Sequence, residues 1–151
     1  MWMLAAVAAM IVGGYARSRY QSGSPLWLDE TYTGFFAANA DLGGVLRDVL
    51  SDVNAPLYHV VSFGFAKVFG LSNEALRAPS LFFGFLAPLL CLAPAPGLDR
   101  NIRFVWCALI ALWPLALQYS LEARCYTMLL CLCVGQTTAF LWLIDKPTIR
   151  R

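Results

Sequence analysis

Two neighbouring carboxylates, Asp29 and Glu30, stand in the run Leu-Trp-Leu-Asp-Glu-Thr-Tyr, directly after bulky apolar residues. Trp27 and Tyr32 are residues of the kind that collects at membrane surfaces, so we expect this run at the boundary between lipid and water. A carboxylate that is partly withdrawn from water holds a proton more strongly and is a better general base. The alternative is a helix start, where Asp29 caps the first turn and Glu30 meets the positive end of the helix dipole.

A second group of polar residues, Asp52, Asn54 and Tyr58, surrounds Pro56. Proline suits the first turn of a helix, and either Asp52 or Asn54 is placed to cap that helix. All three polar side chains can also face a polar ligand at the membrane surface. His59, the next residue, is interpreted as a satisfied polar residue rather than as a ligand or a base.

A third group, Glu122, Arg124 and Tyr126, lies in a predicted turn between two apolar stretches. Its two charges are the only ones between Arg103 and Asp145. Ionisable residues at membrane depth are costly and usually functional. The alternative is a short loop whose charges simply meet water.

Arg77 opens the apolar stretch 78–98. It can anchor a helix by extending its charge toward water, or it can join the other charged residues. Because acidic and basic residues from three separated stretches are expected at one membrane face, they predict a site there.

The composition predicts a membrane protein. Of the 151 residues, 60% are hydrophobic and only 13% are charged, whereas soluble domains have about 25% charged residues. The same values exclude intrinsic disorder. A net charge of +2 without a basic run gives no reason to expect nucleic-acid binding. The five cysteines lie in apolar runs without zinc-binding spacing, so they are interpreted as small hydrophobic residues.

The expected fold is all-α: a polytopic transmembrane bundle of about four spans plus interfacial helices. The spans are predicted at about residues 1–20, 78–98, 103–121 and 125–144, from apolar runs close to the length that crosses a bilayer. The stretch 56–71 is either a fifth span or a helix along the interface. Four spans are favoured because they bring five basic residues together on the cytoplasmic side: Arg100, Arg103, Lys146, Arg150 and Arg151.

Residues 21–77 then form one long extracytoplasmic loop with short helices of its own. Asp41 is placed to cap a helix whose apolar face is formed by Val45, Leu46, Val49 and Leu50. The proline-rich patch at 93–97 predicts a helix end or bend. A loop of this length is usually functional.

The order of these motifs resembles the GT-C superfamily of membrane glycosyltransferases. The resemblance rests on Leu-Asp-Glu, Asp-Val-Asn-Ala-Pro-Leu-Tyr, Phe-Gly-Leu-Ser-Asn-Glu-Ala-Leu-Arg-Ala-Pro-Ser and Tyr-Ser-Leu-Glu-Ala-Arg-Cys-Tyr, in that order between residues 27 and 126. The chain looks most like the family 39-like group, which includes protein O-mannosyltransferases, lipid A aminoarabinose transferases and rhizobial core-sugar transferases.

The resemblance implies a multi-pass enzyme of the bacterial inner membrane that acts on the periplasmic or exterior side. Such an enzyme transfers a sugar from a polyprenyl-phosphate donor to a lipid, glycan or protein acceptor, generally with inversion. By resemblance Asp29 is the catalytic base or the carboxylate that orients the acceptor, and Glu30 beside it is the second expected catalytic residue. The expected substrate-binding residues are Asp52, Asn54, Tyr58, Arg77, Glu122, Arg124 and Tyr126. The resemblance leaves room for a divalent metal and names no ligand for it.

The chain departs from the family in two ways. Asn54 and Ala55 replace a His and a Pro of the usual family motif, which puts in doubt any metal or phosphate contact made through that His. Family members are also several times longer, so the chain is expected to be their amino-terminal part. The alternatives are a truncated or non-catalytic membrane protein, such as a partner subunit or remnant, and, ranked below it, a transporter fragment. A transporter would call for discontinuous helices or an inverted repeat.

Overall fold

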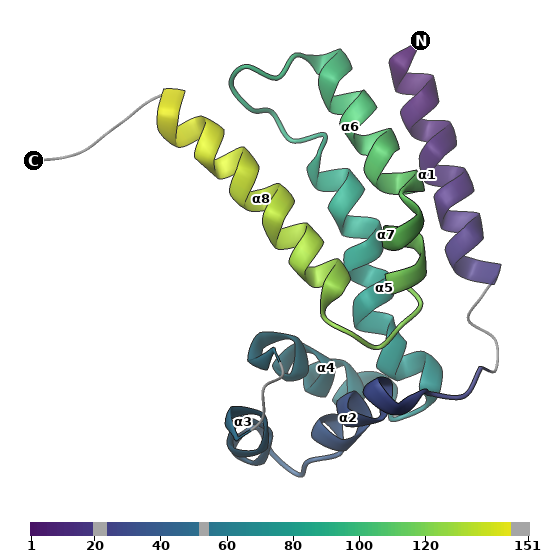
Figure 1. The fold of residues 1–151 in the computed structure, drawn as a ribbon, viewed down its shortest axis with the longest axis vertical. Helices are drawn as coiled ribbons and strands as arrows, with labels where there is room; N and C mark the ends of the chain where they lie inside the picture. Colours follow the sequence, from purple (N-terminus) through teal and green to yellow (C-terminus); the bar gives the residue numbers. More distant parts are fainter. Residues whose placement is uncertain (20–23, 52–54, 146–151) are drawn as a thin grey trace, which may run out of the picture.

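The computed structural model describes residues 1–19, 24–51 and 55–145, and every helix or strand element in these ranges is an α-helix. One group of helices runs along the long axis of the molecule, and another group gathers at one end of it (Figure 1). The helices are α1 (Trp2–Arg19), α2 (Leu28–Ala37), α3 (Leu42–Leu50), α4 (Pro56–Phe69), α5 (Asn73–Leu90), α6 (Arg100–Leu112), α7 (Pro114–Tyr119) and α8 (Tyr126–Asp145). The all-α prediction is confirmed.

Small side chains set the spacing of α1 and α6. Ala6, Ala9 and Gly13 are buried and lie on one face of α1, three and four residues apart. A Cβ atom at Gly13 would lie 2.5 Å from the carbonyl oxygen of Ala111, so a larger residue would push the two helices apart. Close approach through small residues is the usual way in which helices pack inside membranes.

The prediction of one continuous helix over 103–121 is wrong, because the helix is interrupted at Trp113. Trp113 is extended, with φ −60° and ψ 121°, and Pro114 is the first residue of α7. A proline disfavours the helical conformation in the preceding residue and has no N–H for the preceding turn. The outcome is a 13-residue helix followed by a 6-residue helix.

A buried arginine fills this break. Arg17, on the same face of α1 as Gly13, is 1% exposed. Its Nη1 donates to the carbonyl oxygen of Ala111 at 3.2 Å, and its Nε donates to Ser120 Oγ at 3.0 Å. The carbonyls at the end of a helix lack intrahelical donors and carry partial negative charge. Arg17 therefore ties α1 to both sides of the break.

The ends of α5 and α8 differ slightly from the expected spans. Helix α5 begins before residue 78 and stops at Leu90, ahead of the proline-rich patch, as that patch predicts. Helix α8 matches the expected stretch 125–144 to within one residue. Thr127 Oγ1 donates to the carbonyl oxygen of Ser80 at 2.8 Å, which fastens α8 to α5.

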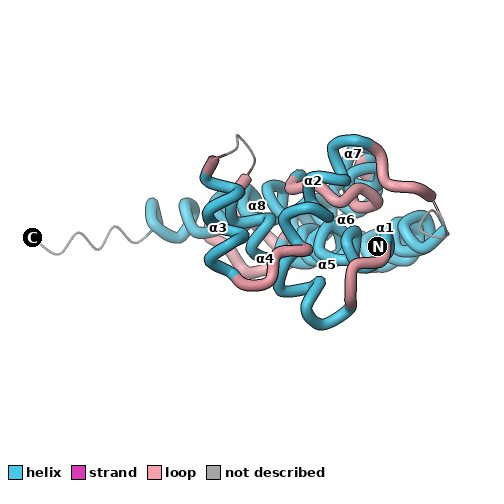
Figure 2. The backbone as a smooth tube through the Cα atoms, turned by 90° about the horizontal axis from the view of Figure 1, so that it is seen from below, coloured by secondary structure: helices cyan, strands magenta, loops and turns pink. Residues whose placement is uncertain are grey.

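Helices α2, α3 and α4 form a layer across one end of the bundle, which we call the end layer. Figure 2 shows these three helices from below, in front of the long helices. Asp41 caps α3 through a 2.8 Å bond from the Gly44 N–H, as predicted. Val45 and Val49 are buried against Phe36. The predicted apolar face is divided, because Leu46 and Leu50 point outward.

Helix α8 is the one helix in the described part of the chain that is long and apolar enough to cross a membrane by length and composition. Trp2–Ser18 forms a shorter apolar helix. The start of α1 and the end of α8 lie at the same end of the bundle, away from the end layer (Figure 1). Helix α4 lies in the end layer, where it packs against α5 through the rings of Phe65 and Phe82.

Candidate functional site

Glu30 and Arg77 form a buried ion pair at the junction of the end layer and the bundle. Glu30 is 0% exposed and Arg77 is 5% exposed. Two parallel hydrogen bonds join them, from Arg77 Nε to Glu30 Oε1 at 2.8 Å and from Arg77 Nη2 to Oε2 at 2.7 Å. Arg77 also donates to the carbonyl oxygens of Ser24 and Pro25. This geometry gives an arginine–carboxylate pair its greatest strength and specificity.

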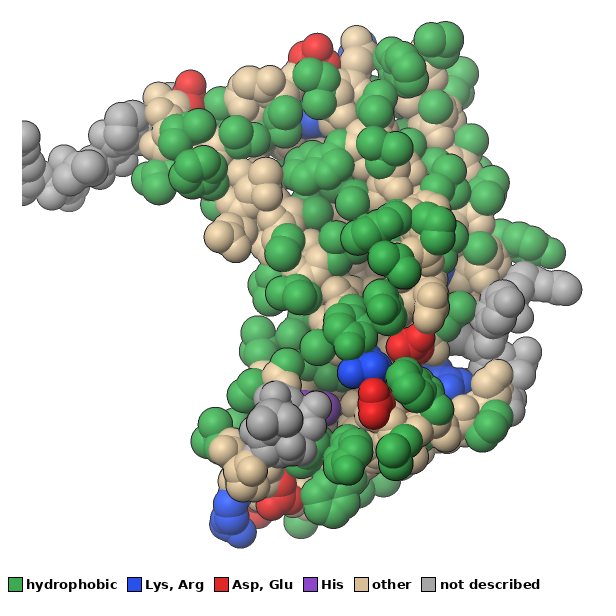
Figure 3. All heavy atoms as spheres, in the orientation of Figure 1, with side chains coloured by type: hydrophobic (Ala, Val, Ile, Leu, Met, Phe, Trp, Pro, Cys, Tyr) green, Lys and Arg blue, Asp and Glu red, His purple; other side chains and the backbone are tan. Residues whose placement is uncertain are grey.

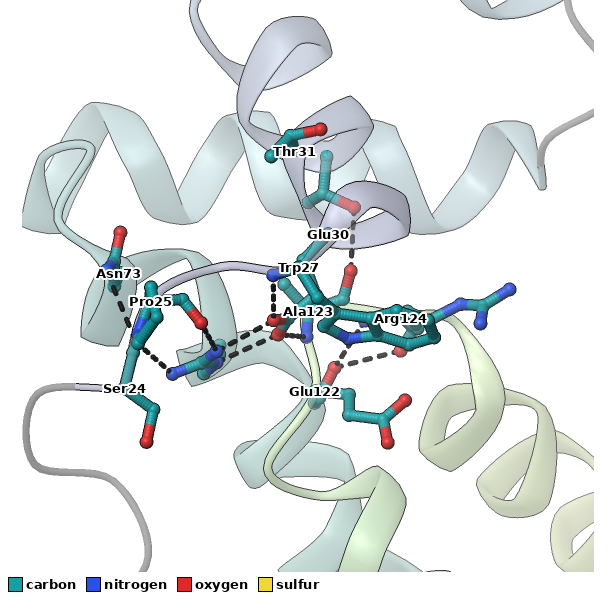
Figure 4. A network of polar contacts seen from close by, with 12 residues as sticks. Ser24, Pro25, Trp27, Glu30, Thr31, Asn73, Glu122, Ala123 and Arg124 are labelled. Atoms are coloured by element: carbon teal, nitrogen blue, oxygen red, sulfur yellow. Dashed lines mark hydrogen bonds and ion pairs between the residues drawn. The ribbon is translucent and has the colours of Figure 1, made fainter.

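Glu30 also accepts two backbone hydrogen bonds. The Ala123 N–H donates to Oε1 at 2.7 Å, and the Trp27 N–H donates to Oε2 at 3.2 Å. Figure 4 shows Trp27 and Ala123 converging on Glu30. Glu30 therefore caps α2, a role that the helix-start alternative gave to Asp29. Burial by itself raises the pKa of Glu30, but the bonds from Arg77 and the two amides outweigh it and lower the pKa below its ordinary value.

The turn between α7 and α8 is held on both sides by buried hydroxyls. Thr33, one turn after Glu30 on α2, donates to the carbonyl oxygen of Ala123 at 2.7 Å. Ser80 Oγ on α5 donates to the carbonyl oxygen of Arg124 at 2.8 Å. Since the Ser80 proton is used there, Tyr58 donates its own proton to Ser80 Oγ at 2.7 Å. Two helices, α2 and α5, thus fix the backbone of two consecutive residues, and Tyr58 on α4 supports Ser80.

The side chain of Arg124 leaves this fixed turn and meets Asp29. Arg124 Nη1 lies 2.9 Å from Asp29 Oδ2, and the two side chains are 28% and 43% exposed. The guanidinium lies over the rings of Tyr126, at 4.7 Å from the centroid, and of Trp27, at 5.4 Å. Asp29 is therefore an accessible carboxylate beside the guanidinium of Arg124. The adjacent carboxylate, Glu30, is buried and already bound by four hydrogen bonds.

An apolar groove begins next to this pair. It has a volume of about 240 Å³ and lies between α7 and α8. Tyr119 and Tyr126 line it, with ring centroids 4.4 Å apart. Because Tyr126 also contacts Arg124, the apolar groove ends beside a positive charge. Its other lining residues are Trp113, Leu115, Ala116, Thr127, Leu129, Leu130 and Cys133.

Glu122 belongs to the same turn, but its carboxylate points elsewhere. Its Oε1 accepts a 3.2 Å bond from Gln118, and its Oε2 is buried without a hydrogen-bond partner among the described residues. Figure 3 shows acidic and basic side chains gathered where the bundle meets the end layer, below a surface that is mainly hydrophobic.

The structure brings together five of the predicted residues: Asp29, Glu30, Arg77, Arg124 and Tyr126. The predicted surface position of Tyr58 is wrong. Its side chain is 0% exposed because it packs inside the end layer, and burial raises its pKa to about 12. The predictions for Asp52 and Asn54 fall outside the described residues.

The sequence analysis missed the residues that hold the turn, namely Thr33, Ser80 and the backbone of Ala123. Each is small and common, and its role depends on a partner 44 to 90 positions away. A usable signal existed for Thr33, because it lies three residues after Glu30 and therefore on the same face of α2. Arg17 carried a signal too, as a charge at the end of a stripe of small residues.

No three His, Cys, Asp or Glu side chains of the described residues gather in a way that could hold a metal ion. We therefore name no metal ligands. The comparisons find no matching family model, curated protein or solved structure. The function is accordingly argued from the site itself and from the resemblance of its motifs.

Proposed function

We propose that the protein is a membrane glycosyltransferase of the GT-C type, which moves a sugar from a polyprenyl-phosphate donor to an extracytoplasmic acceptor. One observation carries the proposal: an accessible carboxylate, Asp29, is held 2.9 Å from the guanidinium of Arg124 at the end of an apolar bundle. The reaction needs a base for the acceptor and a positive charge for the leaving phosphate. This pair supplies both.

In this proposal the long helices cross the bilayer and the end layer lies at its outer surface. The bundle exposes many apolar side chains, among them Leu4, Ile11, Leu109 and Leu129. In water they would form a large exposed apolar surface that promotes aggregation. The end layer also exposes aromatic residues suited to the interface, including Trp27 and Tyr32. The shared position of the first and last helix ends fits four crossings. A bacterial inner membrane with the site outside follows from the resemblance.

The donor fits the combination of groove and arginine. A polyprenyl phosphate has an apolar tail and an anionic head, and the groove between α7 and α8 is apolar along its walls and ends near Arg124. The tail lies in the groove while the phosphate binds the guanidinium. The buried bonds from Thr33 and Ser80 to the turn keep Arg124 in place before the donor arrives.

The chemistry is a single displacement. The acceptor hydroxyl oxygen forms a bond to the anomeric carbon as the bond from that carbon to the phosphate oxygen breaks. The electron pair of the broken bond leaves with the polyprenyl phosphate, whose charge Arg124 stabilises. Asp29 takes the hydroxyl proton. When the donor phosphate competes for Arg124, Asp29 Oδ2 is released from its ion pair and is free to act.

The proposal is tested by placing the full chain in lipid vesicles with polyprenyl-phosphate sugars labelled in the sugar. Transfer of label to an added glycan, lipid or peptide acceptor, with release of polyprenyl phosphate, supports the proposal. Binding without turnover would favour the alternative of a non-catalytic membrane protein. Failure to bind any polyprenyl phosphate would show that a polyprenyl-phosphate sugar is not the donor.

A further inference from the structure

A second groove lies in the end layer, between α2 and α3. Its volume is about 610 Å³, within the range of about 300–1,000 Å³ that is usual for small-ligand sites. Its lining combines aromatic rings with oxygen-bearing side chains: Thr31, Tyr32, Phe35, Phe36, Asp48 and Ser51. We call it the end-layer groove. None of its residues takes part in the transfer chemistry described above.

Three of the lining side chains present hydrogen-bond acceptors. Thr31 Oγ1 donates its proton to the carbonyl oxygen of Leu28, and Ser51 Oγ donates to that of Asp48 at 2.7 Å. Each hydroxyl oxygen is thereby left as an acceptor, and an ionised carboxylate such as Asp48 only accepts. Asn39 holds that carboxylate through a 3.0 Å bond from its Nδ2 to Oδ2. These side chains therefore suit a ligand that brings several donors.

The aromatic rings give the groove an apolar wall. Tyr32 is 47% exposed and Phe35 is 64% exposed, while Phe36 is buried in the core of the end layer. The face of an aromatic ring carries partial negative charge, so it attracts the weakly positive C–H groups of a sugar ring. An aromatic wall beside several acceptors matches the two kinds of surface that a sugar has, an apolar face and an edge of hydroxyl donors.

The charges around the groove argue against a basic peptide as the ligand. Arg47 adjoins Asp48 on α3. Lys67 on α4 donates to the carbonyl oxygens of Asn39 and Ala40, and Asn39 is the residue that holds Asp48. Two cations thus offset the one carboxylate of the groove, and like charges brought together disfavour the wrong partner. A neutral ligand with many hydroxyl groups meets no such repulsion.

We propose that the end-layer groove binds a neutral carbohydrate and that this carbohydrate is the acceptor of the transfer reaction. Tyr32 lies three residues after Asp29 on α2, so their Cβ atoms are neighbours about 5–6 Å apart. A sugar that stacks on the Tyr32 ring and donates to Asp48 therefore brings a further hydroxyl to Asp29. Among lipid, glycan and protein acceptors, the groove selects a glycan. The role as acceptor rests on the proposed function, whereas the binding does not require transfer.

Binding is measured with the full chain in lipid vesicles and without any donor. The probes are an array of neutral mono- to tetrasaccharides built from hexoses, heptoses and deoxyhexoses, together with pentalysine as a basic peptide. We expect saturable binding of at least one saccharide and none of pentalysine. The saccharide that binds most tightly is then titrated calorimetrically against each variant.

The variants separate the aromatic wall from the acceptors. Tyr32→Ala should raise the dissociation constant about three- to tenfold by removing a ring contact. Asp48→Asn keeps the size of the side chain but replaces an acceptor oxygen with a donor, and it should raise the constant at least about tenfold. Phe69→Ala is the matched control, because this ring on α4 is 63% exposed and does not line the groove.

The fold of each variant is checked by its unfolding midpoint in denaturant. Both rings tested lie at the surface, so we expect midpoints equal to that of the wild type. Phe35→Ala provides a second test of the aromatic wall if Tyr32→Ala unfolds early, with the same expected weakening.

Three results would overturn the proposal. One is the absence of binding to every saccharide of the array, and another is preferential binding of pentalysine, which would make the groove a peptide site. The third is equal affinity of the wild type, Tyr32→Ala and Asp48→Asn, which would place the sugar elsewhere.

The variant Asp29→Asn distinguishes failure of this inference from failure of the proposed function. It should bind the saccharide as the wild type does, because Asp29 does not line the groove. Saccharide binding that the groove variants weaken, without transfer by the wild type, supports the carbohydrate site and contradicts the proposed function. Transfer that Tyr32→Ala and Asp48→Asn leave unchanged contradicts the carbohydrate site alone.

Discussion

Asp29 and Glu30 are the same kind of chemical group in adjacent positions, and their surroundings give them opposite tasks. Glu30 accepts four hydrogen bonds in the interior and joins α2 to α5 and to the turn before α8. Asp29 remains accessible beside Arg124. A buried carboxylate with every acceptor position in use stabilises the fold, while an accessible one is free to take a proton.

Glu30→Gln should destabilise the protein strongly. It removes the charge that balances the buried Arg77, and leaving one partner of a buried pair uncompensated costs about 3–5 kcal/mol. The free energy of unfolding in detergent, measured by denaturant titration, checks the value. Asp29→Asn is the matched control, because an exposed pair contributes at most about 1 kcal/mol. Equal losses in the two variants would contradict the assignment.

The lowered pKa of Glu30 predicts how stability depends on pH. An unfolded glutamate titrates near pH 4.3. Since the folded value is lower, the stabilisation is complete above about pH 4.3 and is lost as the pH falls further, through the folded pKa. Unfolding measured at pH values from about 3 to 6 should show this loss in the wild type and a smaller one in Glu30→Gln. Parallel curves would show that Glu30 titrates as it does in the unfolded chain.

At the scale of the elements, the helices are positioned by small residues and by the break at Trp113. A Cβ atom at Gly84 on α5 would collide with Ser120 Oγ and lie 3.4 Å from Arg17 Nε. Gly84 therefore leaves space for the hydrogen bond from Arg17 to Ser120, beside which α1, α5 and α7 meet. Ser120 begins the turn that ends in the α8 helix, so the contact also supports the site.

Gly84→Ala should destabilise the protein by roughly 1–3 kcal/mol, the usual cost of extra volume in a packed interior. Gly135→Ala on α8 is the matched control, because a Cβ atom there meets nothing within 4 Å. That control should stabilise its helix by up to about 1 kcal/mol. The unfolding free energies of the two variants should therefore change in opposite directions. A stabilised Gly84→Ala would refute the close approach.

The elements were predictable from the sequence where local signals act. Asp41 and Pro56 mark helix starts by their own chemistry, and the apolar run of α8 gives its length. The break in 103–121 had a local cause as well, Pro114, which the uniform hydrophobicity of the run concealed. The contacts of Arg17 were not predictable, because the carbonyl that it binds becomes free only through that break.

The site was partly predictable for a related reason. Charged residues are so few in this chain that Asp29, Arg77 and Arg124 attract notice without a structure. Their pairing was not visible, since it depends on which of two adjacent carboxylates turns inward. Glu30 turns inward because it lies on the buried face of α2 together with Thr33, which binds the same residue, Ala123.

At the scale of the whole molecule, the protein has two different ends joined by an apolar middle. The end layer holds the paired charges of the candidate site, and the opposite end holds Arg100, Asp145 and the start of the chain. Of the other basic residues predicted for that side, Arg103 donates to the carbonyl oxygen of Leu92 at 2.7 Å. The predictions for Lys146, Arg150 and Arg151 fall outside the described residues. Such an arrangement suits a donor whose tail stays in lipid and whose head reaches one surface.

In the proposed function Asp29 is the base of sugar transfer, and the variant Asp29→Asn tests this role. Transfer from a labelled polyprenyl-phosphate sugar is measured for the full chain in vesicles, with Asp99→Asn as a control that changes a helix cap at the start of α6, away from the site. A positioned base contributes about 10²–10⁴-fold. We predict that Asp29→Asn lowers turnover by at least about a hundredfold while membrane insertion and donor binding persist and Asp99→Asn remains active. Turnover by Asp29→Asn equal to that of the wild type would show that Asp29 is not the base.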